Sequence, residues 1–324
     1  MPVKGLTFCF LVSIFSLIVS CDQKATMFSS LPSSKTNIDF KNEPAKKKLL
    51  SILYYLYYYN GGGVAAGDIN NDGLPDLYFS ANSNGGNKLY LNKGNFEFED
   101  ITESAGVAGT SDWHTGVTMT DVNGDGLMDI YVCAIAGAHG LEGRNQLFVN
   151  NGDSTFTESA KQYGLDFSGF STQAAFFDYD HDGDLDCYLL NQSQRPHQNI
   201  VDTSNRRKFD AEVGDRFYRN DLVIAGITTT NEKFTDVSAE TGIFQSNLGY
   251  GLGIAVADFN NDGWEDVYVG NDFHENDYYY LNNKNGTFKE SGGNHFGHYS
   301  RFSMGNDAAD YNNDGQIDIV TVDM

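Results

Sequence analysis

Five copies of a nine-residue motif place oxygen-bearing side chains at fixed positions. The first copy is DINNDGLPD from Asp68, and the others begin at Asp121, Asp178, Asp258 and Asp310. In each copy, positions one, three, five and nine are Asp or Asn, and position six is Gly. Alternate side chains of a tight turn can converge on one ion, and Gly permits the positive φ of such a turn. Since Ca²⁺ takes about six to eight oxygen ligands, the motifs predict about five Ca²⁺ sites.

The candidate metal ligands are the side chains at these four positions of each motif. By copy they are Asp68, Asn70, Asp72 and Asp76; Asp121, Asn123, Asp125 and Asp129; Asp178, Asp180, Asp182 and Asp186; Asp258, Asn260, Asp262 and Asp266; and Asp310, Asn312, Asp314 and Asp318. A backbone carbonyl at position seven would add a further oxygen. The alternative is a set of Asp-Asn-Gly turns that bind no metal, and the fivefold repetition argues against it.

The motifs differ from EF-hand loops at position twelve and in their flanking segments. An EF-hand requires Glu at position twelve and a helix on each side. Position twelve is instead Phe79, Val132, Leu189, Val269 and Thr321. The stretches after the motifs, such as LYFSA and IYVCA, are rich in β-branched and aromatic residues, which favour strands. Each motif is therefore predicted to join the two strands of a hairpin.

The spacing of the motifs indicates a repeat architecture. Neighbouring motifs begin 52 to 57 residues apart, except for one interval of 80. Each full repeat has an aromatic and small-residue lead-in, the motif with its strand, a further strand with an Asn turn, and a fourth segment that begins with Phe. About four short antiparallel strands per repeat is typical of a propeller blade. We predict an all-β propeller over residues 49–324, with four-stranded antiparallel blades and Ca²⁺-binding hairpin loops.

The fifth repeat contains only the residues of its first hairpin. We therefore expect an incomplete last blade and a protein that continues beyond Met324. Residues 52–59, ILYYLYYY, are dense in strand formers, and we expect a strand with one buried face that closes the ring against the last blade. An aromatic platform that stacks on sugars is the alternative for this segment.

The N-terminal residues have the features of a lipoprotein signal. Lys4 precedes an apolar run that is too short to span a bilayer and ends in Ile-Val-Ser-Cys21. We predict a signal peptide over residues 1–20, lipidation of Cys21 and a polar tether over residues 21–48. An ordinary secretory peptide is the alternative. The predicted location is a bacterial outer membrane or cell surface, with the lipid as the membrane anchor.

Two other features depart from the repeat. The long interval places about 25 extra residues within 192–215, including Arg195, Arg206, Arg207 and Lys208. They form either a plain surface insertion or a partner-binding loop. Cys133 and Cys187 are expected to be free cysteines of the core, because period-two counting places them on opposite faces of their strands. His114 and His181 are expected at the surface.

The motifs and their lead-ins together resemble the FG-GAP/VCBS-type repeats of calcium-binding β-propellers, such as integrin α-subunit heads. The stretches YNGGGVAAGDINNDGLPDLYF, NDFHENDYYYLNN and FSMGNDAADYNNDGQIDIVTVDM are similar to lipid-anchored bacterial proteins of the cartilage acidic protein type. The resemblance covers about residue 50 to the end. It implies a calcium-rigidified propeller at the cell surface, in a protein that continues past this point into a further small domain.

Composition and motifs favour binding over catalysis. The formal net charge is −23, whereas a nucleic-acid-binding protein needs a basic surface, so we expect no nucleic-acid partner. The sequence has no Gly-x-Ser-x-Gly, His-Glu-x-x-His or phosphate-binding Gly loop. Nearly all patterned carboxylates are already candidate metal ligands. We therefore expect an interaction or adhesion module for a protein or a glycan. The alternative is a propeller-based carbohydrate-active hydrolase or lyase, which would need two metal-free carboxylates in a deep axial pocket.

Overall fold

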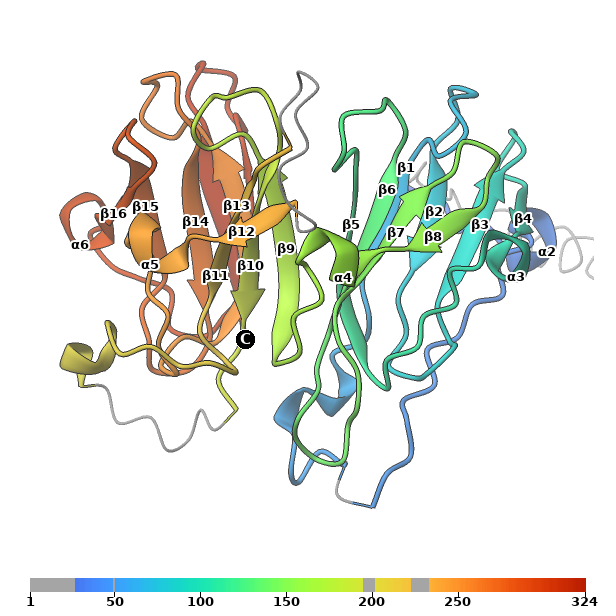
Figure 1. Cartoon of the computed structure of the whole chain (residues 1–324), viewed down its shortest axis with the longest axis horizontal. Coiled ribbons are helices and arrows are strands. Elements are labelled where there is room, and N and C mark those ends of the chain that lie inside the picture. The colour runs from blue at the N-terminus through green and yellow to red at the C-terminus, as the bar shows by residue number, and fades with distance from the viewer. Residues whose placement is uncertain (1–26, 49, 195–201, 223–232) are drawn as a thin grey trace, which may run out of the picture.

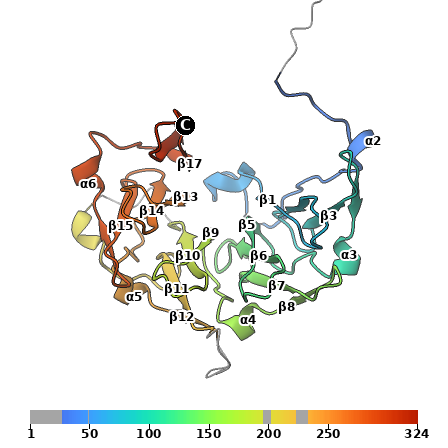
Figure 2. The same ribbon diagram turned by 90° about the horizontal axis from the view of Figure 1, so that it is seen from above.

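The computed structural model describes residues 27–48, 50–194, 202–222 and 233–324. Its strands form five antiparallel sheets (Figure 1). Seen from above, the sheets are arranged like segments of a ring, with the first and fifth sheets at the two ends of the arc (Figure 2). Four sheets have four strands and the fifth has two. The predicted all-β propeller with an incomplete last blade is therefore confirmed.

The blades succeed one another along the chain. Blade one comprises β1 (Val64–Gly67), β2 (Asp76–Phe79), β3 (Lys88–Asn92) and β4 (Phe98–Asp100). Blade two comprises β5 (His114–Thr120), β6 (Asp129–Ala134), β7 (Gln146–Asn150) and β8 (Phe156–Glu158). Blade three comprises β9 (Ser171–Phe177), β10 (Asp186–Asn191), β11 (Arg216–Asn220) and β12 (Phe234–Asp236). Blade four comprises β13 (Gly251–Ala257), β14 (Asp266–Asn271), β15 (Tyr278–Asn282) and β16 (Phe288–Glu290), and blade five comprises β17 (Ser303–Ala309) and β18 (Asp318–Asp323).

The helices are short. They are α2 (Ser33–Thr36), α3 (Thr102–Ala105), α4 (Ala160–Tyr163), α5 (Ser238–Thr241), α6 (Gly292–His295) and the 3₁₀ segments η1 (Leu56–Tyr59) and η3 (Thr203–Asn205). Each of the single turns α3 to α6 comes after the outermost strand of its blade, and the sequence patterns did not predict these turns. In α3, the carboxylate of Asp100 accepts hydrogen bonds from the backbone N–H and the hydroxyl of Thr102, which starts the turn. Gly106 then ends it with a φ of 75°.

The second strands of blades two, three and four each lie between two neighbouring blades, so both of their faces are buried. In β6, Ile130 and Val132 belong to the core shared with blade one, whereas Tyr131 and Cys133 face blade three. This alternation explains why the strand is apolar almost without interruption. Cys187 of β10 faces the same core as Cys133, and both are buried and free, as predicted.

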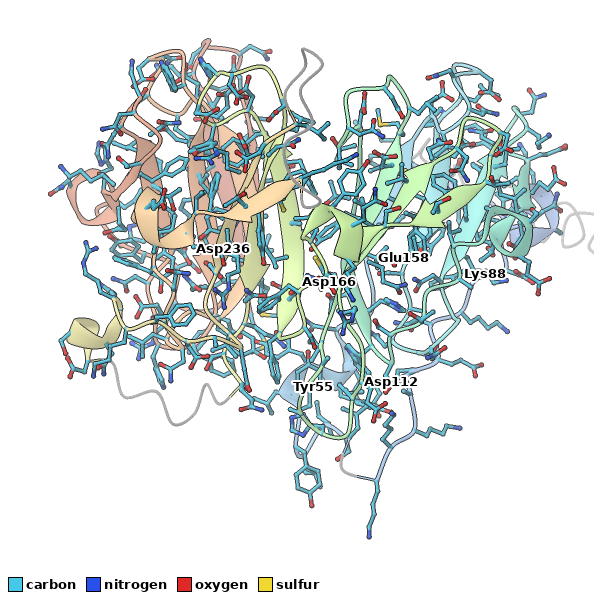
Figure 3. The ribbon with its side chains drawn as sticks, viewed as in Figure 1. Tyr55, Lys88, Asp112, Glu158, Asp166 and Asp236 are labelled. Atoms are coloured by element: carbon cyan, nitrogen blue, oxygen red, sulfur yellow. The ribbon has the colours of Figure 1, made fainter. Side chains whose placement is uncertain are left out.

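Residues 52–59 do not form the predicted strand. Residues 52–54 lie in a turn, and Leu56–Tyr59 form the 3₁₀ helix η1, so this segment provides no closing strand. Tyr55 and Tyr57 point into an apolar cluster with side chains from blades two, three and four, while Tyr54 and Tyr59 are exposed. The tyrosines pack against several blades, and this packing decides the conformation. The strand propensity of the segment takes no account of such distant contacts. Figure 3 places Tyr55 at the end of the molecule where Asp112 also lies.

The cluster defines one end of the propeller axis. Tyr55 lies edge-on to Trp113, with ring centroids 5.7 Å apart, and Tyr57 lies 4.9 Å from Tyr250. The Tyr55 hydroxyl accepts a hydrogen bond of 2.9 Å from Nε2 of Gln192, just beyond the end of β10. We call this the tyrosine end. The five motif loops lie at the opposite end, where β2, β6, β10, β14 and β18 begin, and we call this the loop end.

Several other expectations concern the periphery. The predicted signal peptide and Cys21 lie outside the described residues. Part of the predicted tether contacts blade one, because Phe40 stacks on Phe79 with ring centroids 5.0 Å apart. Among the described helices, none has the length and apolar character needed to cross a membrane.

The described part of the insertion is anchored to blade four. Arg206 donates a hydrogen bond of 2.6 Å from Nε to the buried carboxylate of Glu275. This cation of the insertion is therefore paired with a buried carboxylate of blade four. His114 was expected at the surface but is fully buried, and burial lowers its pKa. Its ring lies within hydrogen-bond distance of the Ala81 carbonyl and the side chain of Gln146.

Candidate functional site

The five motif loops share one hydrogen-bonded conformation. The position-one carboxylate accepts the backbone N–H of position five at 2.9–3.1 Å and that of position six at 2.7–3.1 Å in every loop. The position-five carboxylate accepts the N–H of position seven at 2.9–3.2 Å. These bonds turn positions one and five toward the inside of each loop. All five loops therefore share one turn, but among the described residues three predicted carboxylate ligands come within 4.8 Å of one another only in the third loop.

The tight turn depends on two left-handed residues in each loop. The Gly at position six has φ between 84° and 99°, as the sequence predicts. Position four is also left-handed, although only one of its five residues is Gly. It is Asn71, Gly124, His181, Asn261 and Asn313. Asn adopts this region more readily than most residues, so its recurrence at position four is a sequence signal for the turn.

The position-nine Asp has a structural role that the motif alone did not reveal. In the first loop, Asp76 is fully buried, and its Oδ2 accepts the N–H of Ile69 at 3.0 Å. Its Oδ1 accepts the N–H of Asn92, at the end of β3, at 2.7 Å. Asp129 and Asp186 make the same pair of bonds. The carboxylate thus joins the loop to the third strand of its own blade, whatever it contributes to a metal.

An Asn at the end of the third strand joins each blade to the preceding one. Nδ2 of Asn150 in blade two donates to the Ile69 carbonyl of the first loop at 2.8 Å. Asn220 of blade three donates to Val122 of the second loop at 3.2 Å, and Asn282 of blade four donates to Tyr179 of the third loop at 2.8 Å. All three Asn side chains are almost fully buried. The recurrence of Asn at this register is the sequence signal for these interblade clamps.

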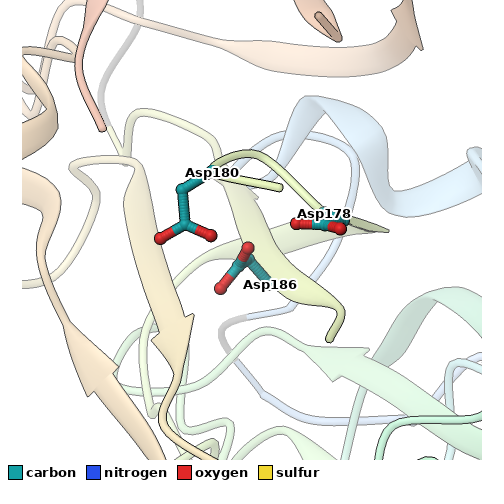
Figure 4. A group of neighbouring side chains, drawn as sticks. All are labelled: Asp178, Asp180 and Asp186. Atoms are coloured by element: carbon teal, nitrogen blue, oxygen red, sulfur yellow. The ribbon is translucent and has the colours of Figure 1, made fainter. Parts of the chain in front are cut away.

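The third loop has the densest carboxylate cluster. Oxygens of Asp178, Asp180 and Asp186 all lie within 4.8 Å of one another, and Figure 4 shows the three side chains gathered around one point. Oδ1 of Asp180 is buried without a hydrogen-bond partner. A buried carboxylate oxygen with no donor is costly unless a cation or a proton compensates it. The donor set consists of hard oxygens, which fits Ca²⁺.

The electrostatics of this loop agree with that fit. Burial, together with the neighbouring carboxylates, raises the pKa of Asp186 to about 8 and that of Asp184 to about 7. The pKa of Asp180 is raised for the same reasons. Like charges brought this close disfavour ionisation of one another, and a divalent cation would reverse that effect. The other four loops have Asn at position three, so they carry one carboxylate fewer at the four predicted ligand positions.

Apart from the motif loops, a cavity of about 180 Å³ lies on the axis at the tyrosine end. Its wall includes Tyr55, Tyr57, Trp113, Gln192 and the backbone of the glycines at 61–63. In the described part of the chain, the residues that line it include neither Asp nor Glu. This cavity therefore does not supply the pair of carboxylates that a glycosidase requires.

The repeats match a known family. The profile described as "FG-GAP-like repeat" matches residues 68–132, 134–189 and 258–321, which together make up more than half of the chain. The chain belongs to the FG-GAP-like repeat family. The matched residues contain all five motifs and leave out residues 190–257, where the insertion lies. The FG-GAP-like assignment agrees with the resemblance that the motifs and lead-ins predict.

Two individual proteins are similar to this FG-GAP-like chain. Cartilage acidic protein 1 of Xenopus tropicalis is 31% identical over 208 residues, which are 63% of this chain and 28% of that protein. The chain thus matches less than a third of the relative's length. A solved structure of an Agrocybe aegerita lectin, described for its recognition of non-reducing terminal N-acetylglucosamine, is 19% identical with a TM-score of 0.43. The match covers 80% of this chain and 59% of the lectin, and at that TM-score it carries no argument about ligands.

Proposed function

We propose that this FG-GAP-like propeller is a calcium-binding, lipid-anchored module of a bacterial cell surface that binds a protein or a glycan. The observation that carries the calcium assignment is the third loop, where three carboxylates converge and one buried oxygen lacks a partner. The other loops repeat the same backbone conformation with one amide in place of a carboxylate. About five ions would also offset part of the net charge of −23.

Calorimetric titration of the metal-free protein with Ca²⁺ tests this assignment. We expect about five sites, and Asp72→Ala or Asp262→Ala should each remove one ion because position five lies inside the loop. Asn71→Gly is a matched control, since Gly124 occupies this left-handed position in the second loop and the Asn71 side chain, which donates to the Gly126 carbonyl of the next loop, is not a proposed ligand. Fewer than three sites in the wild-type protein would contradict the five-site proposal.

The binding role rests on the architecture and on the absence of catalytic motifs in the sequence. A ring of rigid blades with exposed loops presents fixed side chains to a partner, as loops on stable scaffolds commonly do. A glycan array and a pull-down with the calcium-loaded mature chain test this role. Retention of neither a glycan nor a protein would contradict it.

The lipid anchor is proposed from residues 1–21 alone. Cys21→Ser should release the protein from the membrane fraction, whereas Cys9→Ser should leave it there because Cys9 belongs to the removed signal peptide. Mass spectrometry of the mature N-terminus measures the acylation directly. A wild-type protein without fatty acid in the soluble fraction would show that the anchor proposal is wrong.

A further inference from the structure

The seam between blades three and four departs from the other seams at the loop end. A cavity of about 410 Å³ opens there, bounded by the third loop, Trp264 of the fourth loop and the turn between β15 and β16. Its wall includes Arg219, Lys284 and Thr287. We propose that this cavity binds a saccharide that carries a carboxylate, which deepens the proposed function above by naming a site and a ligand class.

Trp264 supplies an aromatic surface that is held in place. Its ring stacks on His181 with centroids 4.0 Å apart and an interplanar angle of 8°. His181 in turn lies 3.0 Å from the Glu265 carboxylate. One ring face is thus covered by His181, which does not line the cavity, so the opposite face and edge remain for a ligand. A preorganised aromatic ring binds the apolar face of a sugar at a low entropic cost.

Arg219 and Lys284 supply positive charge in a strongly acidic protein. Nε of Arg219 donates a hydrogen bond of 2.8 Å to Asp221. Its two terminal nitrogens have no hydrogen-bond partner among the described residues, so they can bind a ligand. Nζ of Lys284 donates to the Asp262 carbonyl at 3.0 Å and lies 3.4 Å from that carboxylate. Arg presents a planar fork that matches a carboxylate. The two cations beside an aromatic ring therefore favour an acidic sugar over a neutral one.

The other blades serve as internal controls, because the strand register identifies equivalent positions. Arg219 pairs with Thr235, just as Leu91 pairs with Glu99 and Val149 with Thr157. The position of Arg219 is aliphatic in all the other full blades, as Leu91, Val149 and Leu281. The position of Trp264 is Leu74, Leu127, Asp184 and Gln316 in the other loops. Both exceptions, the Arg and the Trp, line the same cavity, which plain blade packing does not require.

Two acidic residues also line the cavity, and because of their charge the test is made in the presence of Ca²⁺. Asp180 is one of the three converging carboxylates of the third loop, and a bound Ca²⁺ would offset its charge. Glu240, in α5, is exposed. All binding measurements are therefore made on the mature chain with saturating Ca²⁺, after the calcium titration has established how many ions it holds.

The experiment compares a galacturonic acid trisaccharide with its carboxyl-reduced, neutral counterpart by calorimetry. We expect the acidic sugar to bind about tenfold more tightly than the neutral one. Arg219→Leu, which copies the residue of blades one and four, should remove that difference. Trp264→Leu, which copies loops one and two, should weaken both sugars about tenfold. Lys93→Ala, in the corresponding turn of blade one, is the matched control and should change neither.

The possible results separate this inference from the proposed function. Equal binding of both sugars by the wild-type protein, or unchanged binding by the Trp264→Leu variant, would overturn the site. Binding of a short polyglutamate peptide without binding of either sugar would overturn the saccharide class. None of these results would contradict the proposed function, which the calcium titration and the glycan array with pull-down test separately. Sugar binding by a chain that holds no Ca²⁺ would support the site and contradict the calcium proposal.

Discussion

The loop end and the tyrosine end of the propeller are built on different principles. At the loop end, every blade repeats one hydrogen-bonded turn, and the side chains that leave the pattern gather at a single seam. At the tyrosine end, one unique segment, Tyr55 to Tyr59, packs against several different blades. Repetition gives one end many equal sites, whereas the other end depends on a few large, unrepeated side chains.

Removal of Ca²⁺ should have the largest effect, because it acts on the loop end as a whole. A ligand present at a hundred times its Kd stabilises the folded state by about 2.7 kcal/mol per site, so several sites together exceed any single substitution. Thermal unfolding with excess Ca²⁺ and with EDTA measures the difference, and Mg²⁺ is the control ion. Equal melting temperatures in Ca²⁺ and EDTA would mean that the loops fold without a bound ion and that Ca²⁺ adds no stability.

Truncation of Trp113 tests the tyrosine end. Trp113 is 1% exposed and contacts Tyr55 and Tyr58, with ring centroids 5.7 and 5.5 Å away. Trp113→Ala should lower the free energy of unfolding by about 3–5 kcal/mol while the calcium stoichiometry stays the same. Tyr59→Ala is the control, because a side chain that is 76% exposed should change the free energy by less than about 0.5 kcal/mol. A lost calcium site in Trp113→Ala would show that the two ends are coupled.

The first two blades and the next two differ in one buried group near the tyrosine end. Before its third strand, blade two has Asn145, which donates to the Tyr131 hydroxyl at 3.0 Å. Blade three has Asp215 at the same place, where it accepts from the Tyr188 hydroxyl at 2.7 Å. Burial raises the pKa of Asp215 to about 7, while its backbone bond with Asn191, the Tyr188 hydroxyl and nearby Arg216 act in the opposite direction.

This difference predicts a pH dependence of stability. A raised carboxyl pKa means that the folded state holds the proton at higher pH than the unfolded chain, so stability is lost as the pH rises from about 4 to about 7. Asp215→Asn should reduce that loss by an amount on the order of 3 kcal/mol. Denaturant unfolding at several pH values measures the difference between the two proteins. Asn145→Asp should introduce a similar loss in blade two, and parallel pH profiles for all three proteins would contradict the prediction.

The smallest of the four expected effects concerns a single interblade clamp. Asn150 is 3% exposed, and its Nδ2 donates to the carbonyls of Ile69 and Met128. Asn150→Ala should cost about 1–3 kcal/mol, since it leaves buried carbonyls without a donor. Asn151→Ala is the neighbouring control, because its exposed side chain bonds only to two nearby threonine hydroxyls among the described residues. Comparable losses in both variants would show that the clamp adds nothing beyond an ordinary surface bond.

The repeat made the fold and the loop positions predictable. Spacing and strand propensity indicated the blades, and the oxygen pattern indicated which side chains converge. The Tyr-rich segment was misassigned because its partners, such as Trp113 and Tyr250, are distant in sequence, and only the arrangement of the blades around the axis brings them together. Burial of His114 was missed for the same reason. The cavity beside Trp264 was also missed, since it requires residues from two blades at once.

The interblade clamps give the molecule a direction. Each of the three Asn side chains belongs to a later blade and donates to a loop of the blade before it. The chain emerges from the ribosome with its N-terminus first, so each of the first three loops receives this donor only after about 80 to 100 further residues have been made. Until the third strand of the next blade has been made, the carbonyl of each of these loops therefore lacks this donor. Maturation of the loops should proceed in the order of translation, each blade completing its predecessor.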